Sequence, residues 1–222
     1  MMKKIALFSM VFVLSIFLIG CSVTTVDLVE ENLSEYTQTY YFAENEDFYC
    51  TLSSGQRESE YLMDGKSGDS VNFALLSLVL NGDLQGKVIK VKVVIDGAES
   101  EEELEINSLN NAYMIDLERE FSGNEQVEVD FSGQRLKLEN VSKAFGIDSK
   151  KALEIAVEQL EDKILAQKRY NELNSECYLR VLDKKANSFD DLFWCFTVLD
   201  IEGKSSSVII STIDGSVLAK SN

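Results

Sequence analysis

The sequence predicts an α+β protein, with an all-β sandwich over residues 36–140 followed by a small helix-plus-antiparallel-sheet domain over residues 141–222. Three observations support this. Short apolar or alternating segments recur through the first region at the spacing typical of a sandwich. Turn sequences containing glycine separate those segments. After residue 148 the apolar residues change from a period of two to spacings of three and four, as in an amphipathic helix.

The all-β region contains eight candidate strands. They are residues 36–43, 47–53, 71–80, 87–95, 101–108, 112–117, 126–131 and 135–138. In 87–95 the residues Ile89, Val91, Val93 and Ile95 share one face, which indicates a strand buried on one side. The run 71–80 is almost continuously apolar, which suits either a central strand or a buried helix. The number and spacing of the strands resemble an immunoglobulin-like sandwich.

The C-terminal region begins with a predicted helix over 148–170. Leu153, Val157, Leu160 and Ile164 form its apolar stripe. Asp148 or Ser149 can cap its first turn. Strand-like segments follow at 177–182, 193–199 and 207–212, with a short tail at 216–220.

This helix-plus-sheet region resembles the PepSY family. The matching residues are Ala152-Leu153-Glu154-Ile155-Ala156, Trp194 with Phe196 and Val198, and Val208-Ile209-Ile210 leading into Asp214-Gly215-Ser216-Val217-Leu218. The resemblance covers the last third of the chain. It implies an extracytoplasmic binding or peptidase-regulating module without catalysis of its own.

The N-terminus carries Lys3 and Lys4, an apolar stretch over 5–19, and then Leu18-Ile19-Gly20-Cys21. The stretch is shorter than the roughly 20 residues of a stable membrane span and is typical of a secretory signal core. The motif resembles the lipobox of bacterial lipoprotein signal peptides, with residues 1–20 as the signal peptide. An ordinary signal peptide with an incidental cysteine is the alternative.

The lipobox resemblance implies cleavage between Gly20 and Cys21, with a diacylglyceryl group on the Cys21 thiol. Several acyl chains would then hold the protein on the lipid bilayer, at the extracytoplasmic face of the cell membrane. Residues 21–35 are expected to be the lipidated N-terminus and a tether.

Charge and composition narrow the function. Cleavage would remove two lysines and no acidic residue, taking the net charge from −17 to −19. A surface this acidic repels nucleic acid. The absence of histidine excludes Ser-His-Asp and Cys-His hydrolases and His-ligated zinc sites. We expect no cofactor.

Three cysteines follow Cys21. Cys177 and Cys195 lie on two candidate neighbouring strands, so a cross-strand disulfide is geometrically possible in an exported protein. The alternative is that these two residues and Cys50 are small buried apolar side chains.

An acidic cluster surrounds the predicted turn at 96–97. Asp96, Glu99, Glu101 and Glu103 supply oxygen ligands of the kind that Ca²⁺ prefers. The alternative is a solvated strand face without a metal.

Aromatic residues gather in the first two predicted strands. They are Tyr36, Tyr40, Tyr41, Phe42, Phe48 and Tyr49. They could form a platform on which sugars or peptides stack, or they could be core residues with tyrosine edges at the surface.

These features together predict a membrane-anchored, non-catalytic binding or regulatory module. Its expected partner, besides the bilayer, is an unidentified envelope protein or peptide. The alternatives are an envelope hydrolase that uses carboxylates alone, as glycosidases do, and a purely structural envelope protein.

Overall fold

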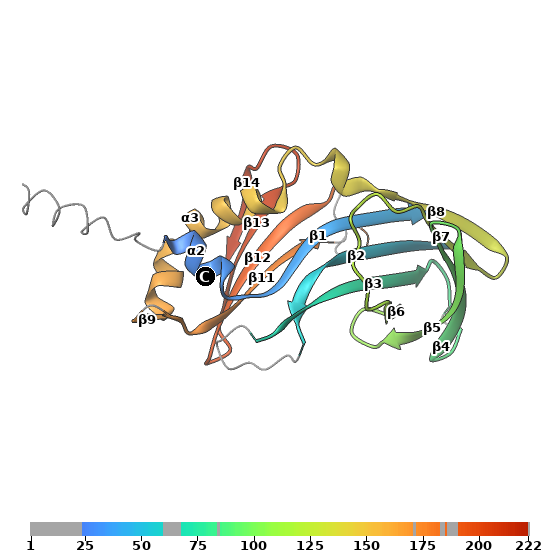
Figure 1. Ribbon diagram of the computed structural model, residues 1–222, viewed down its shortest axis with the longest axis horizontal. Coiled ribbons are helices and arrows are strands. Elements are labelled where there is room, and N and C mark those ends of the chain that lie inside the picture. The colour runs from blue at the N-terminus through green and yellow to red at the C-terminus, as the bar shows by residue number, and fades with distance from the viewer. Residues whose placement is uncertain are drawn as a thin grey trace, which may run out of the picture.

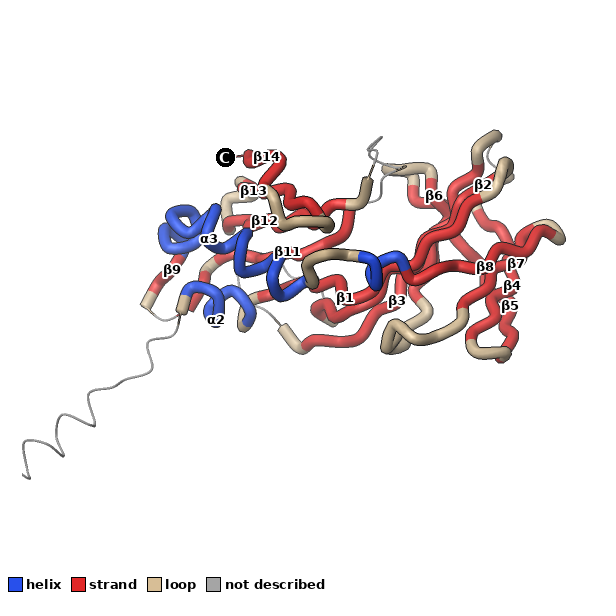
Figure 2. The backbone as a smooth tube through the Cα atoms, turned by 90° about the horizontal axis from the view of Figure 1, so that it is seen from above, coloured by secondary structure: helices blue, strands red, loops and turns tan. Residues whose placement is uncertain are grey.

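The computed structural model describes residues 24–59, 68–83, 85–170, 172–182, 185 and 191–221. This part of the chain forms one large β-sheet with helices on one side (Figures 1 and 2). The helical elements are α2 (Thr25–Glu30), α3 (Ser149–Gln167) and the 3₁₀ turn η1 (Val141–Ala144).

Twelve strands make up the large sheet. They are β1 (Leu33–Glu44), β2 (Phe48–Glu58), β3 (Ser70–Leu80), β4 (Val88–Ile95), β5 (Ala98–Asn107), β6 (Ala112–Asp116), β7 (Val127–Phe131), β8 (Gln134–Asn140), β11 (Ser175–Leu182), β12 (Phe193–Asp200), β13 (Ser205–Ser211) and β14 (Val217–Ser221). A separate small hairpin pairs β9 (Lys168–Arg169) with β10 (Glu172–Leu173). The predicted strands lie where expected to within a few residues, and the run 71–80 is strand β3.

The prediction of an immunoglobulin-like sandwich is wrong, because the first eight strands close into an antiparallel barrel. They follow the order β1-β2-β3-β6-β5-β4-β7-β8, and β8 then pairs with β1. Closure rests on two residue pairs, Tyr41 with Asn140 and Phe42 with Glu139. Sandwiches and barrels share the same alternating strand pattern, so only this non-local pairing distinguishes them.

The small helix-plus-sheet region predicted over residues 141–222 does not form a sheet of its own. Its strands β11 to β14 continue the sheet of the barrel. The first half of β1 pairs in parallel with β11, and β12, β13 and β14 follow outward. Helices α2 and α3 cover this open part of the sheet around a core that includes Leu28, Leu160 and Trp194. The barrel holds the other core, which includes Tyr41, Leu76 and Val129.

The expected tether over 21–35 is folded from Thr24 onward. The Thr24 side chain accepts a hydrogen bond from Asp27 N, and the Asp27 carboxylate accepts one from Thr24 N, so α2 starts with a capping box. Leu28 and Val29 are buried in the helix-side core. An amphipathic turn of helix followed directly by β1 therefore replaces the flexible coil, because these apolar side chains have a surface to cover.

A bulge in β1 places both cores on the same face of the sheet. The register of β1 against β2 shifts between Thr37 and Thr39. Before the shift Tyr36 packs on the helix-side core, and after it Tyr41 lies in the barrel core. Side chains alternate along a strand, so an even-numbered and an odd-numbered residue can share a face only if one residue is inserted between them. We call this side, which carries Leu52 of β2, the core face, and the opposite side, which carries Ser53, the groove face.

Gly55 of β2 makes this bulge possible. It lies opposite Thr37, and a Cβ atom at this position would be 1.9 Å from the carbonyl oxygen of Tyr36. No other residue can occupy this position without moving β1 away from β2.

We therefore predict that Gly55→Ala lowers the free energy of unfolding by more than about 3 kcal/mol, since backbone must shift to admit the methyl group. Urea unfolding followed by circular dichroism measures this. The matched control is Gly82→Ala, because a Cβ there has no neighbour within 4 Å. Equal stability of the Gly55→Ala protein and the wild type would contradict the role assigned to this contact.

Hydrogen bonds hold the loop between β6 and β7 against the barrel seam. Glu125 Oε1 accepts from Ser122 N and Ser122 Oγ at 2.7 and 2.8 Å, and Glu125 Oε2 accepts from the Tyr41 hydroxyl at 3.0 Å. Asn140, which pairs with Tyr41 across the seam, donates from Nδ2 to the Gly123 carbonyl at 2.8 Å. Burial opposes ionisation of Glu125, but the hydrogen bonds from Ser122 and Tyr41 outweigh it and lower the pKa of Glu125 to about 2.

A lowered pKa in the folded state contributes stability above the ordinary glutamate value of 4.5, and this contribution is lost as the pH falls toward 2. We expect Glu125→Gln to cost about 1 kcal/mol at pH 7. In urea titrations at pH 7, 4 and 2.5 the difference from wild type should shrink as the pH falls. Glu120→Gln in the same exposed loop is the control. A difference independent of pH would refute the ionic role of Glu125.

Candidate functional site

The groove face carries a groove of about 420 Å³ that runs over the outside of the barrel onto strand β11. Thr51, Ser53 and Ser77 alternate with the core residues Leu52, Leu76 and Leu78, so they point outward because their neighbours point inward. Leu75, Val79, Met114 and Leu182 contribute apolar surface between these hydroxyls. The groove is therefore mixed in character, with hydrogen-bonding and aliphatic side chains interleaved.

One end of the groove is a fixed ion pair. Glu35 of β1 and Arg180 of β11 form two parallel hydrogen bonds, each of 2.7 Å, from Arg180 Nε and Nη2 to the two carboxylate oxygens. The guanidinium also lies 4.7 Å from the ring centroid of Tyr178. This bidentate geometry fixes the guanidinium across the parallel junction between β1 and β11.

The aromatic residues of β1 and β2 do not form an exposed stacking platform. Tyr41 and Phe48 belong to the barrel core. Tyr40 and Tyr49 lie on the groove face but are only 3% and 5% exposed. The interpretation as core and edge packing is therefore the one that the structure supports, and the open surface of the groove is hydroxyl and aliphatic.

Cys177 and Cys195 lie on opposite faces of the sheet, and both are free thiols. Cys177 is opposite Val198 in the helix-side core, whereas Cys195 is opposite Arg180 on the groove face. The cross-strand disulfide is thus not formed, because the two positions differ in the parity that sets side-chain direction. Burial raises the pKa of Cys177 to about 12 and also raises the pKa of Cys195.

Three glutamates of the acidic cluster near residue 96 pair with lysines across strands β4 and β5. Lys92 Nζ lies 3.2 Å from Glu99, and Lys90 Nζ lies 3.3 Å from Glu101 and 3.1 Å from Glu103. Asp96 Oδ1 accepts from Gln126 N at 2.9 Å in a tight turn. Among the described residues no three acidic, cysteine or histidine side chains are placed to hold a metal ion. This arrangement matches the alternative of a solvated strand face.

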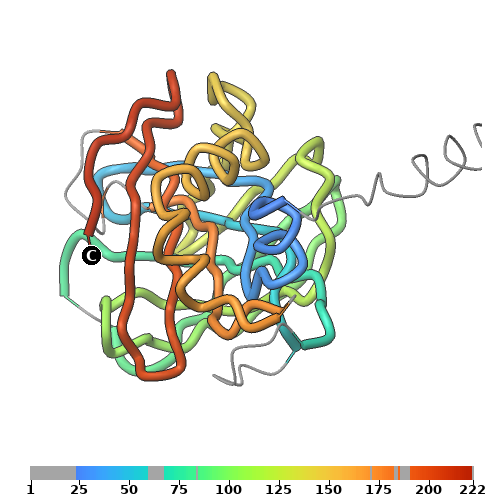
Figure 3. Tube along the Cα trace, turned by 90° about the vertical axis from the view of Figure 1, so that its left-hand side faces the viewer, coloured from blue at the N-terminus to red at the C-terminus, as the bar shows by residue number. Residues whose placement is uncertain are grey.

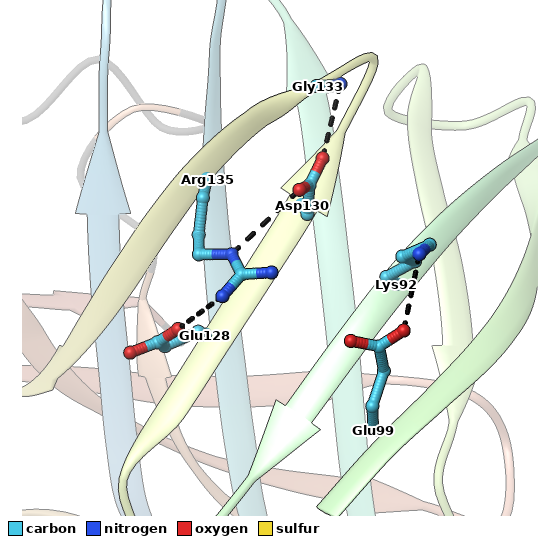
Figure 4. Close-up of polar contacts among 6 residues, drawn as sticks. All are labelled: Lys92, Glu99, Glu128, Asp130, Gly133 and Arg135. Carbon is cyan, nitrogen blue, oxygen red and sulfur yellow. Dashed lines mark hydrogen bonds and ion pairs between the residues drawn. The ribbon is translucent and has the colours of Figure 1, made fainter. Parts of the chain in front are cut away.

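A second cross-strand charge cluster lies on β7 and β8. Arg135 lies 3.4 Å from Glu128 and 3.8 Å from Asp130. Figure 4 shows these contacts beside the Lys92–Glu99 pair. Asp130 also accepts from Gly133 N at 3.1 Å, which fixes the tight hairpin turn. These exposed pairs are typical of a barrel's outer surface and offer no catalytic geometry.

Residues 1–20, the predicted cleavage site at Gly20 and the predicted lipidation site at Cys21 lie outside the described residues. Within the described chain, no helix has both the length and the apolar character needed to cross a bilayer.

Comparisons with protein-family models, with curated protein sequences and with solved structures found no match. The lipobox and PepSY resemblances therefore remain predictions.

Sequence reasoning missed the groove, although part of its signal is visible. The outward positions of β2 and β3 include Thr51, Ser53 and Ser77, which are hydroxyl residues next to buried leucines. What the pattern could not show is that β11 lies beside β1 and brings Arg180 to Glu35, since these residues are 145 positions apart.

The cysteines provide a direct test of the sheet faces. Among the three described cysteines of the folded protein, we expect a maleimide to label Cys195 because it is partly exposed. Cys50 and Cys177 should stay unmodified until the chain is unfolded because they are buried. Mass spectrometry of tryptic peptides locates the label, and Cys195→Ser should abolish it. Labelling of Cys177 at the same rate, or a Cys177–Cys195 cross-linked peptide under non-reducing conditions, would show that the faces are wrongly assigned.

Proposed function

We propose that this protein is a lipid-anchored, extracytoplasmic binding protein that holds an extended peptide segment in the groove and has no catalytic activity. The observation that carries the proposal is the groove itself, which interleaves hydroxyls with aliphatic side chains beside a fixed ion pair. The anchoring part rests on the lipobox-like residues Leu18–Cys21.

A peptide suits the groove better than a sugar does. Hydroxyl groups both donate and accept hydrogen bonds, so Ser53 and Ser77 can pair with either the N–H or the C=O groups of a peptide backbone. Leu75, Val79 and Met114 can receive apolar side chains between those contacts. Sugar sites usually stack rings on exposed aromatic faces, and Tyr40 and Tyr49 are buried.

The charge of the protein favours a neutral or basic peptide. The chain has a net charge of −17, so an acidic segment would be repelled as it approached. The Glu35–Arg180 ion pair at the end of the groove could make a polar contact with one end of such a peptide.

Two features favour binding without catalysis. The chain has no histidine, which removes the usual general base. Among the described residues that line the groove, Glu35 is the one carboxylate, and both its oxygens accept from Arg180. Hydrolysis by carboxylates alone needs a pair of them flanking the scissile bond.

The test is selection of peptides from a random display library by the purified full-length protein in detergent micelles. Peptides that bind should lose affinity by at least about tenfold on Ser77→Arg, because a long charged side chain fills the groove. Ser100→Arg, the same change at an exposed position of β5, is the matched control and should bind as the wild type does. Recovery of no peptide, or of peptides insensitive to Ser77→Arg, would refute the proposal.

A further inference from the structure

We propose that the β9–β10 hairpin is a second membrane contact, in which Tyr170, Lys168 and Arg169 lie on the surface of an anionic phospholipid bilayer beside the lipidated Cys21. This inference rests on the lipid anchoring in the proposed function. It adds an interaction surface and an orientation that the lipobox alone does not imply.

The hairpin and the start of the folded chain lie at the same end of the molecule. Strand β10 contacts α2, and Leu173 shares the helix-side core with Leu28 and Val29. The Thr25 hydroxyl donates to Glu161 Oε1 at 3.3 Å, which places the first residue of α2 beside the last turns of α3. Figures 1 and 3 show α2, the end of α3 and the hairpin together, opposite the barrel.

The short connection to Cys21 holds this end close to the bilayer. Two residues separate Cys21 from Thr24, so the Cα atoms of Cys21 and Thr24 are at most about 11 Å apart at 3.8 Å per residue. Acyl chains on Cys21 would therefore bring the start of α2 to the headgroup region. A body folded from Thr24 cannot stand off from the membrane as a long flexible tether would allow.

The hairpin has the composition of a membrane-surface element. Tyr170 is 99% exposed at the turn, with a positive φ of 59°, although tyrosine is a large and partly apolar side chain. Tyrosine is enriched where bilayer meets water, because its ring enters the apolar edge and its hydroxyl stays hydrated. The neighbouring Leu165 is 43% exposed and adds apolar surface at the same end.

The charges of the hairpin complement anionic lipid in a chain that is otherwise acidic. Residues 163–170, Lys-Ile-Leu-Ala-Gln-Lys-Arg-Tyr, include three basic residues and no acidic one, but Glu161 and Asp162 directly precede them, and α2 carries Asp27 and Glu30 at the same end. Glu172 is opposite Arg169 within the hairpin and offsets part of this charge. Basic residues near the surface are attracted to anionic headgroups, and acidic ones are repelled. The protein would therefore orient with the hairpin toward the bilayer and the acidic barrel away from it.

Fluorescence quenching by brominated lipids tests this contact. The full-length lipidated protein is reconstituted into vesicles of phosphatidylethanolamine and phosphatidylglycerol that contain brominated acyl chains. In Tyr170→Trp the new indole should lose about half or more of its emission, as expected of an interfacial aromatic residue. The native Trp194 is buried and gives a constant background. The matched control is Leu109→Trp. Leu109 is 94% exposed in a turn between two barrel strands, and the fluorescence of an indole there should not be quenched.

A charge-reversed variant tests the chemistry of the contact. Lys168→Glu with Arg169→Glu, in the Tyr170→Trp protein, should reduce the quenching in these anionic vesicles because the electrostatic attraction is lost. Flotation of the same samples separates the two proposals. If the Tyr170→Trp protein floats with the vesicles while its new indole stays unquenched, the hairpin contact alone is overturned. Two results would overturn the lipid anchor and the inference that depends on it. One is that the wild-type protein fails to float with the vesicles; the other is that the Cys21→Ser variant floats as well as the wild type.

Discussion

The approach of Gly55 to the carbonyl oxygen of Tyr36 is the contact on which the architecture depends. With no side chain at Gly55, β2 follows β1 through the bulge between Thr37 and Thr39 without a break in pairing. One long strand can then serve two neighbours, β11 in its first half and β8 in its second half. A barrel and a helix-covered sheet are joined in this way, and each can bury its own core.

The bulge also decides which face of the sheet carries the groove. Both cores lie on the core face of the sheet. The groove face is therefore outside the barrel, and the helices do not cover it. Hydroxyl side chains from β2 and β3 remain there at the outward positions, and the parallel junction with β11 adds the Glu35–Arg180 pair. The groove is thus a by-product of how the two cores share one sheet. It forms without any residue type that would attract notice in the sequence.

Charge is distributed unevenly along the molecule, and this distribution bears on how the protein would lie at a membrane. Lys90, Lys92 and Arg135 pair with some of the barrel's acidic side chains across strands, but acidic residues stay in excess over residues 33–140. The helix end presents the β9–β10 hairpin beside the start of the folded chain. Because the described chain is folded from Thr24, the N-cap of α2, a lipid on Cys21 would couple the bilayer directly to the helix-side core. Binding at the groove and attachment to the membrane would then occur in one rigid unit.

Local structure could be predicted from the order of residues alone: the strands of the large sheet, with 71–80 left open between strand and helix, and the helix over Ser149–Gln167 with Asp148 as one of two candidate caps. Alternation and helical periodicity are local signals, so they can be read without knowing the neighbours. The folded chain was needed to establish that β8 returns to β1, that β11 extends the same sheet, that Cys177 and Cys195 face apart, and that Arg180 meets Glu35. These features depend on pairings between residues tens to more than a hundred positions apart, and on a one-residue bulge that reverses side-chain parity without leaving a mark in the pattern.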